Sequence, residues 1–340
     1  MKFGVTLGIG PQVQIDLEAI RRVEAAGFDS LWAGEAWGSD AITPLAYVAG
    51  HTSRIKLGTS IMQMSARTPA MAAMQAMTVD KLSGGRMIVG LGPSGPQVIE
   101  GWHGQPYGKP LTRTREYIAI MRQIFARQDR VAFQGECYQI PYTGEGASGL
   151  GKPLRSILHG RPDIPIYTAA ISPRGVATAA QVADGVIPLW VTPEGLDGFA
   201  ADIESGFAKA DGEKGWDDFD VQPSVNVIVG DDLQACRDKL RPQLALYVGG
   251  MGARSKNFYN NLVSRQGWPD AAKEIQDLYL GGQRNEAMAA VPDDLIDAVA
   301  LVGPKERVRD RLDAWRDSRA TGLVFSGSPD SIEAVAEIAL

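Results

Sequence analysis

The sequence predicts an α/β protein of the (β/α)8 TIM barrel class, with residues 1–340 forming a single domain. Short β-rich runs alternate with longer helical patterns, which is typical of βα units around a parallel sheet. Eight such units follow one another. This number favours a closed barrel over an open doubly wound sheet built from the same elements. Two segments, at about 128–163 and 249–301, interrupt the alternation and are predicted to be insertions.

The first four units occupy the N-terminal third of the chain. The Ile15–Ala26 segment has apolar side chains at helical spacing, and Gly27 is placed to end that helix. A second helix includes Pro44–Ala49. Pro69 suits the first turn of a third helix that runs to about Leu82. The predicted strands of these units are Phe3–Gly8, Ser30–Ala33, Ile55–Ile61 and Met87–Gly92.

The later units follow the first insertion, in which a small hairpin is expected around Val131–Ile140. The second insertion has a mainly helical pattern. The predicted strands are Ile164–Ala169, Gly185–Leu189, Val221–Val229 and Gly322–Phe325. The helix Arg113–Ala126 is predicted just before the first insertion, and the later predicted helices are Gly175–Val182, Leu196–Ala210, Leu233–Leu246, Lys305–Arg316 and Ser331–Leu340. In a barrel of this kind the chemistry lies on the loops that follow the strands.

One glycine-rich segment imitates a dinucleotide-binding fingerprint. Gly90–Gly95 matches G-x-G-x-x-G directly after a strand. The residues that follow, Pro96–Gly104, lack a helical stripe, so we expect no helix N-terminus beside the third glycine. Pro93 also removes a backbone donor that such a loop would use. We therefore reject a Rossmann reading of this segment.

Composition excludes several functional classes. The chain has a net charge of −6 and no basic block, which argues against a nucleic-acid partner. Cys137 and Cys236 have no metal-ligand spacing, and the three histidines have no carboxylate cluster, so no metal site is expected. No apolar run is long enough to span a bilayer, and the N-terminus reads directly into a strand. These features predict a cytoplasmic protein without membrane insertion.

Several segments, taken together and in order, resemble the luciferase-like monooxygenase superfamily, in particular its branch that depends on coenzyme F420 and includes methylenetetrahydromethanopterin reductase. These segments are Ser30-Leu-Trp-Ala-Gly-Glu35, Leu57-Gly-Thr-Ser-Ile61, Ala76-Met-Thr-Val-Asp80, Leu82-Ser-Gly-Gly-Arg86, Val89-Gly-Leu-Gly92, Glu100-Gly-Trp-His103, Arg113-Thr-Arg-Glu-Tyr117, Pro165-Ile-Tyr-Thr-Ala-Ala170, Ala183-Asp-Gly185 and Val302-Gly-Pro-Lys-Glu-Arg-Val308. The resemblance implies an enzyme with a deazaflavin ring in the barrel mouth, and it implies a homodimer.

The resemblance also implies where the ring lies. A bulge after the third strand would contain a non-prolyl cis peptide at Ser60–Ile61, with Ile61 pressing on the rear face of the ring. Met62 and Gly92 complete the expected ring contacts. Without the resemblance, an ordinary buried strand end is the preferred interpretation at this point, because a sequence alone never shows a cis bond. The Leu82–Arg86 segment is interpreted as a helix end and turn without chemistry.

The turn after the fifth strand is expected to bind the cofactor phosphate. It comprises Ala169, Ala170, Ile171 and Ser172, with Arg174 adding charge. Backbone N–H groups at a helix N-terminus favour an anion, although a plain helix cap is the alternative. The cofactor's polyglutamate tail would meet cations at the mouth. The candidates are Arg67, Arg174, Arg254 and Lys256.

Three residues are candidates for acid–base chemistry. Glu35 follows the second strand, where the family usually has an acidic residue, and could contact the ring or instead pair with Lys or Arg. Related dehydrogenases carry a glutamate where Pro96 stands here, and Glu100 matches only a later one. His103 is a candidate because imidazole is the usual side chain for proton transfer near neutral pH; the alternative is a structural role beside Trp102.

The sequence therefore predicts hydride transfer between coenzyme F420 and a small organic substrate that the sequence does not identify. Two alternatives remain open at this point. One is an FMN-dependent monooxygenase of the same superfamily, and the other is a catalytically silent barrel that binds the cofactor. Trp37, Met62 and Met64 lie on mouth loops and favour an apolar substrate.

Overall fold

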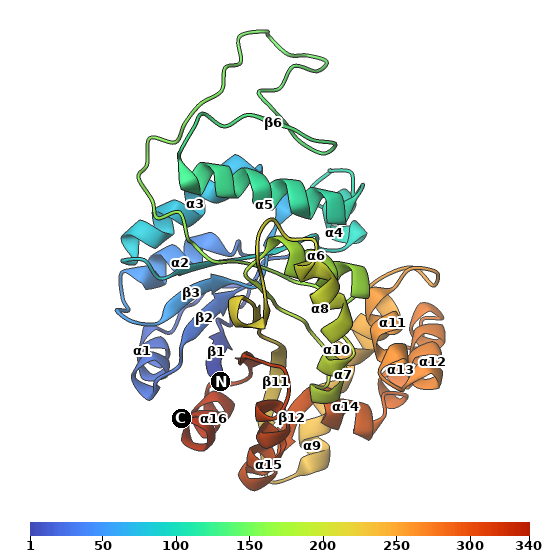
Figure 1. Ribbon diagram of the computed structural model, residues 1–340. Coiled ribbons are helices and arrows are strands. Elements are labelled where there is room, and N and C mark those ends of the chain that lie inside the picture. Colours follow the sequence, from blue (N-terminus) through green and yellow to red (C-terminus); the bar gives the residue numbers. More distant parts are fainter.

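The protein is a curled parallel sheet surrounded by helices, seen in a computed structural model that describes residues 1–340 (Figure 1). Helices cover the outside of the sheet, and both termini lie on the same side, near β1 (Lys2–Thr6) and α16 (Pro329–Ala339) (Figure 1). The residues of the first insertion form a long loop that extends beyond α5 (Pro110–Ala126), away from the body of the molecule (Figure 1). The predicted barrel class is confirmed.

The strands follow the predicted order along the chain. They are β1 (Lys2–Thr6), β2 (Ser30–Ala33), β3 (Lys56–Thr59), β4 (Met62–Gln63), β5 (Met87–Gly92), β6 (Phe133–Gln134), β7 (Gln139–Ile140), β8 (Ile166–Thr168), β9 (Gly185–Val186), β10 (Asp220–Val221), β11 (Ser224–Val229), β12 (Ala300–Gly303) and β13 (Gly322–Ser326). The antiparallel β6–β7 pair is the small hairpin that the sequence predicted in the first insertion.

The helices come mainly between the strands. They are α1 (Leu17–Ala26), α2 (Ile42–Ala49), α3 (Pro69–Leu82), α4 (Pro96–Gly101), α5 (Pro110–Ala126), α6 (Pro173–Val182), α7 (Pro193–Asp197), α8 (Ala200–Phe207), α9 (Leu233–Asp238), α10 (Arg241–Ala245), α11 (Phe258–Arg265), α12 (Pro269–Leu280), α13 (Arg284–Ala289), α14 (Asp293–Val299), α15 (Lys305–Arg316) and α16 (Pro329–Ala339). Short 3-10 turns lie at Met64–Ala66 and Trp216–Asp218, and a π-turn lies at Leu246–Gly250.

Parallel pairing closes the sheet into a ring. The hydrogen-bonded order runs β10-β9-β8-β5-β3-β2-β1-β13-β11. β10 leads into β11 after two residues, and Leu189 bridges to Ser224 at the start of β11. The segment from β9 to Leu189 therefore pairs with β10 and with the start of β11, which are the two ends of this order, and it closes the ring. Counting β10 and β11 as one interrupted strand, eight strands form the ring.

A bulky inner core fills the ring. Trp32 on β2 is fully buried and forms a small cluster with side chains from other strands of the ring, including Tyr167 on β8. Glycines on the two neighbouring strands make room for the indole. A Cβ on Gly58 would lie 2.3 Å from Trp32, and a Cβ on Gly4 would lie 2.7 Å from it. A separate cluster of 73 buried residues packs the strands against the helices.

The secondary structure predicted from the sequence is wrong for two segments. Pro96–Gly101 forms a short helix, α4, capped by Gly95, although Pro96–Gly104 was expected to be non-helical. Six residues are too few to show a periodic stripe, and only Val98 and Ile99 are buried. The second insertion also ends in a strand, because β12 pairs with Asn226–Val229, the part of β11 beyond the Leu189 bridge.

The remaining differences are breaks within predicted elements. The expected helix Leu233–Leu246 is divided into α9 and α10, and Pro242 lies in the first turn of α10. The expected helix Leu196–Ala210 is divided near Gly198. No helix is long and apolar enough to cross a membrane.

Candidate active site

Strained backbone marks the loops at the carboxyl ends of the strands. Four non-glycine residues have positive φ, and three lie after ring strands: Val13 (52°) after β1, Ser94 (56°) after β5 and Trp190 (58°) after β9. Such conformations are disfavoured for branched and bulky side chains and gather at functional sites. The mouth of the barrel is therefore the place to look for chemistry.

A bulge lies at the end of the third strand. Gly58 pairs with Ile88 and Met62 pairs with Leu91, so three residues of one strand lie opposite two of the other. The Ser60–Ile61 peptide within the bulge is cis, as the resemblance implied. Ser60 and Ile61 are partly exposed, whereas the residues on both sides of them are buried.

Three glycines on neighbouring strands fit around this bulge. A Cβ on Gly34 would lie 2.7 Å from the Ser60 carbonyl oxygen, and a Cβ on Gly90 would lie 1.8 Å from the Thr59 carbonyl oxygen. A Cβ on Gly92 would lie 2.7 Å from the Ile61 side chain. The bulge is thus held on both sides by backbone that approaches too closely for any other residue.

Glu35 anchors the end of the bulge. Its carboxylate accepts hydrogen bonds from the Gln63 N–H (2.7 Å) and the Ala41 N–H (3.0 Å). It also accepts hydrogen bonds from both terminal nitrogens of the Arg67 guanidinium, at 2.6 and 2.9 Å. The Glu35 side chain is only 6% exposed. All of these bonds are internal, so the pairing that the sequence left open as an alternative is the one that the structure contains.

The Arg67 guanidinium is held charged by this contact. Burial by itself would lower the pKa of Arg67, but the hydrogen bond and charge of Glu35 outweigh it and raise the pKa above its ordinary value. A bidentate arginine–carboxylate pair fixes both side chains in a defined orientation. Glu35 and Arg67 thereby join the loop after β2 to the segment after β4.

Gln63 connects this pair to His103. The Gln63 side-chain amide donates to the Glu35 carbonyl (3.0 Å) and to the Ala36 carbonyl (2.9 Å). These two acceptors set the orientation of the amide, so its oxygen faces His103 Nε2 at 2.9 Å. Nε2 must carry the hydrogen in that contact. Nδ1 is then the nitrogen of His103 that can gain or lose a proton.

The other predicted residues have simpler surroundings. Glu100 is exposed and accepts a hydrogen bond from the Tyr107 N–H at 3.2 Å. Met62 and Met64 are fully buried in the core. Trp37 is 60% exposed beside the mouth. The structure therefore brings Glu35, Ser60, Ile61 and His103 together through Gln63, and it leaves Glu100 on the rim.

The turn after β8 presents unused donors. Ser172 caps α6 by accepting a hydrogen bond from the Gly175 N–H, with Pro173 in the first turn. The N–H groups of Ala170, Ile171, Ser172 and Arg174 have no protein acceptor. These four donors at a helix N-terminus are arranged as an anion-binding turn requires.

Three of the four cations proposed for the cofactor tail are engaged elsewhere. Arg67 pairs with Glu35. Arg254 forms an ion pair with Asp277 on α12. Lys256 lies over the Tyr107 ring, 5.6 Å from its centroid. Arg174 is exposed and has neither a carboxylate partner nor a ring contact.

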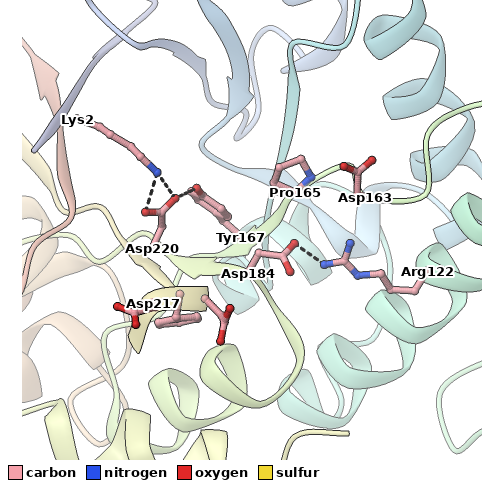
Figure 2. Close-up of a pocket in the computed structure, with 10 residues that line it drawn as sticks. Lys2, Arg122, Asp163, Pro165, Tyr167, Asp184, Asp217 and Asp220 are labelled. Carbon is pink, nitrogen blue, oxygen red and sulfur yellow. Dashed lines mark hydrogen bonds and ion pairs between the residues drawn. The ribbon is translucent and has the colours of Figure 1, made fainter. Parts of the chain in front are cut away.

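A separate hollow of about 360 Å³ lies at the opposite end of the barrel, where the strands begin (Figure 2). Asp220 there accepts hydrogen bonds from the Lys2 amine, at 2.8 Å, and from the Tyr167 hydroxyl. Asp184 forms an ion pair with Arg122. These contacts tie strand starts to each other and to α5. In barrels this end contributes stability rather than catalysis, so we interpret the hollow as structural.

Sequence reasoning missed Gln63 and the partner of Glu35. Gln63 is separated from His103 by 40 positions, and Arg67 from Glu35 by 32. A single sequence gives no signal for either pairing. The polar Gln63 inside an apolar strand end was the one available clue, because a buried amide must find partners.

The fold and the sequence are both similar to known proteins. The family model for luciferase-like monooxygenase matches residues 2–322. A Mycobacterium tuberculosis protein provisionally named a coenzyme F420-dependent oxidoreductase is 43% identical, over 99% of each chain. The 5,10-methylenetetrahydromethanopterin reductase of Archaeoglobus fulgidus is 27% identical, over 97% of this chain and 94% of its own.

Solved structures agree on the fold. The coenzyme F420-dependent tetrahydromethanopterin reductase of Methanopyrus kandleri has a TM-score of 0.81 at 24% identity, covering 99% of this chain and 97% of its own. An F420-dependent secondary alcohol dehydrogenase has a TM-score of 0.75 at 18% identity, with the same coverage of the two chains. The family match spans nearly the whole chain, and the chain belongs to the luciferase-like monooxygenase family.

Proposed function

We propose that this protein is an oxidoreductase that uses coenzyme F420 to exchange a hydride with an organic substrate in the mouth of the barrel. The coenzyme supplies the hydride chemistry when it is bound, and the chain supplies position and proton control. The 43% identical relative, which aligns over 99% of both chains, carries an F420-dependent name and supports the choice of cofactor. The observation that carries the proposal is the bulge between β3 and β4, which is enclosed by Gly34, Gly90 and Gly92 and leaves Ile61 partly exposed.

The bulge suits a flat ring. Ile61 is the apolar residue of the bulge that remains partly exposed, and Gly92 packs directly against its side chain. The surrounding glycines leave no freedom for the bulge to move aside. A planar ring resting on Ile61 would therefore have a fixed support, which is the kind of preorganised contact that hydride transfer needs.

The anion-binding turn fits the phosphate of such a cofactor. Four N–H groups between Ala170 and Arg174 have no acceptor in the protein, and Ser172 already fixes the start of α6. The Arg265 guanidinium donates to the Ile171 carbonyl at 2.9 Å and holds the turn in place. An anion at this turn would satisfy donors that otherwise require water.

His103 is the residue we propose for proton transfer. Gln63 fixes the hydrogen on Nε2, so proton exchange with a substrate oxygen or nitrogen would occur at Nδ1. Glu35 is then a positioning residue. Its carboxylate accepts a hydrogen bond from the Gln63 backbone N–H, and its own backbone carbonyl accepts one from the Gln63 side-chain amide. This assignment replaces the direct catalytic role that the sequence suggested for Glu35.

Cofactor titration tests the proposal. Purified protein should bind coenzyme F420, followed by the change in deazaflavin fluorescence, and should bind FMN much more weakly. Tight FMN binding with no F420 binding would contradict the proposal and favour an FMN-dependent monooxygenase. A silent cofactor-binding barrel would bind F420 but show no cofactor-coupled turnover with any of a panel of alcohols, aldehydes and enones in stopped-flow assays.

A further inference from the structure

A groove with a strongly positive lining runs between α5 and α6 on the outside of the barrel. It has a volume of about 640 Å³ and is lined by Lys109, Arg115, Arg174 and Lys209, with no carboxylate among its lining residues. The chain as a whole has a net charge of −6. Four cations in one groove of an acidic protein are a local reversal of charge.

Three of these cations have no acidic partner. Arg115, Arg174 and Lys209 form no ion pair, whereas Lys109 pairs with Glu136. Arg115 lies 3.4 Å from the Thr178 hydroxyl, and Lys209 donates to Ser205 at 3.2 Å. Like charges gathered without counter-charges repel one another, and an anion in the groove would relieve that repulsion.

The groove begins beside the anion-binding turn. Arg174 is the second residue of α6, directly after the turn with the four free N–H groups. The lining continues along α6 to Gln181. At about 1.5 Å per helical residue, the groove extends roughly 10 Å from the turn. A linear ligand with its phosphate at the turn could therefore continue along these cations.

We propose that this groove binds a short linear chain of carboxylates, such as the oligoglutamate extension of coenzyme F420. The proposal rests on the proposed function for the identity of the ligand. Its geometry selects an extended anion, because the positive lining follows the space between α5 and α6 as far as Lys209, just after α8, and the protein as a whole is acidic. Only Arg174 among the cations suggested by the sequence belongs to the groove.

The test compares cofactor forms that differ only in their glutamates. Deazaflavin fluorescence would give the Kd of F420 with several glutamates and of F420 trimmed of its glutamates. The variant Arg115→Gln/Lys209→Gln should weaken binding of the long form about three- to tenfold, given the modest strength of exposed ion pairs. The trimmed form should be unaffected, and added salt should reduce the difference.

A charge-matched control separates the groove from net charge. Lys81→Gln/Lys239→Gln removes two exposed cations that do not line the groove, and it should leave both Kd values unchanged. Equal weakening of the long and trimmed forms by the groove variant, or no weakening of either, would overturn the proposal.

Free oligo-γ-glutamate tests the groove without the cofactor. Isothermal titration should show binding to the wild-type protein and loss of binding in the groove variant, and the absence of binding to the wild type would overturn the groove proposal. If the wild type binds neither form of F420, the proposed function fails. The titration with free oligo-γ-glutamate still decides whether the groove binds such chains.

Discussion

Replacement of Glu35 by glutamine is the sharpest test of the network at the barrel mouth. Glu35→Gln keeps the shape of the side chain but removes the charge that faces Arg67. The Arg67 side chain is 13% exposed, so water cannot fully replace the lost carboxylate. The amide also places a donor among groups that are all donors: two guanidinium nitrogens and two backbone N–H groups.

The expected loss of stability follows from that burial. Removing one partner of a buried ion pair costs about 3–5 kcal/mol, because the other charge is left uncompensated. Unfolding entropy for 340 residues is about 0.7 kcal/mol per degree, from an average of roughly 2.1 cal/mol/K per residue. The variant should therefore melt about 4–7 °C below the wild type.

Differential scanning calorimetry measures this shift, with Glu333→Gln as the matched control. Glu333 pairs with Arg22, and both side chains are more than half exposed, at 56% and 57%. Exposed pairs contribute at most about 1 kcal/mol, so the control should melt within about 2 °C of the wild type. A Glu35→Gln shift as small as that of the control would refute the reasoning.

Three further variants test other parts of the molecule. His103→Gln should lower turnover about 10²- to 10⁴-fold with little change in the F420 Kd, and unchanged turnover would remove His103 from the chemistry. Gly90→Ala should lower the free energy of unfolding by at least about 1–3 kcal/mol, because the new Cβ would meet the Thr59 carbonyl oxygen. The control Gly8→Ala should cause no such loss, because nothing lies within 4 Å of a Cβ at that position. Chemical denaturation of the two variants makes the comparison. Burial lowers the pKa of Lys214 from 10.5 to about 8, so the unfolded chain binds more protons between these values. Wild-type stability should therefore rise across that pH range relative to Lys214→Met, and parallel melting curves would contradict this.

Local sequence signals located most elements because their causes are local. Thr68 and Ser172 cap helices that begin with proline, as the prolines predicted. Gly84 and Gly85 adopt positive φ at the end of α3, where the sequence placed a stop. Neither feature depends on distant residues, so the chain order is sufficient to read them.

The wrong predictions concern segments whose conformation depends on residues that are distant in the sequence. α4 is one short helix whose apolar residues Val98 and Ile99 are buried by the surrounding fold. β12 forms a strand because the upper half of β11 has a free edge beside it. In both cases the conformation is decided by what lies next to the segment in space, which composition does not report.

The sequence by itself determined the strand–helix alternation, and its family resemblance implied the position of the bulge at Ser60–Ile61. Only the tertiary structure decided what the charged and polar side chains do. It placed Glu35 against Arg67, and it gathered the α5–α6 groove from cations up to 100 positions apart, from Lys109 to Lys209. Electrostatic and hydrogen-bond energies depend on distance in space, and ring closure sets those distances between residues that the sequence keeps far apart.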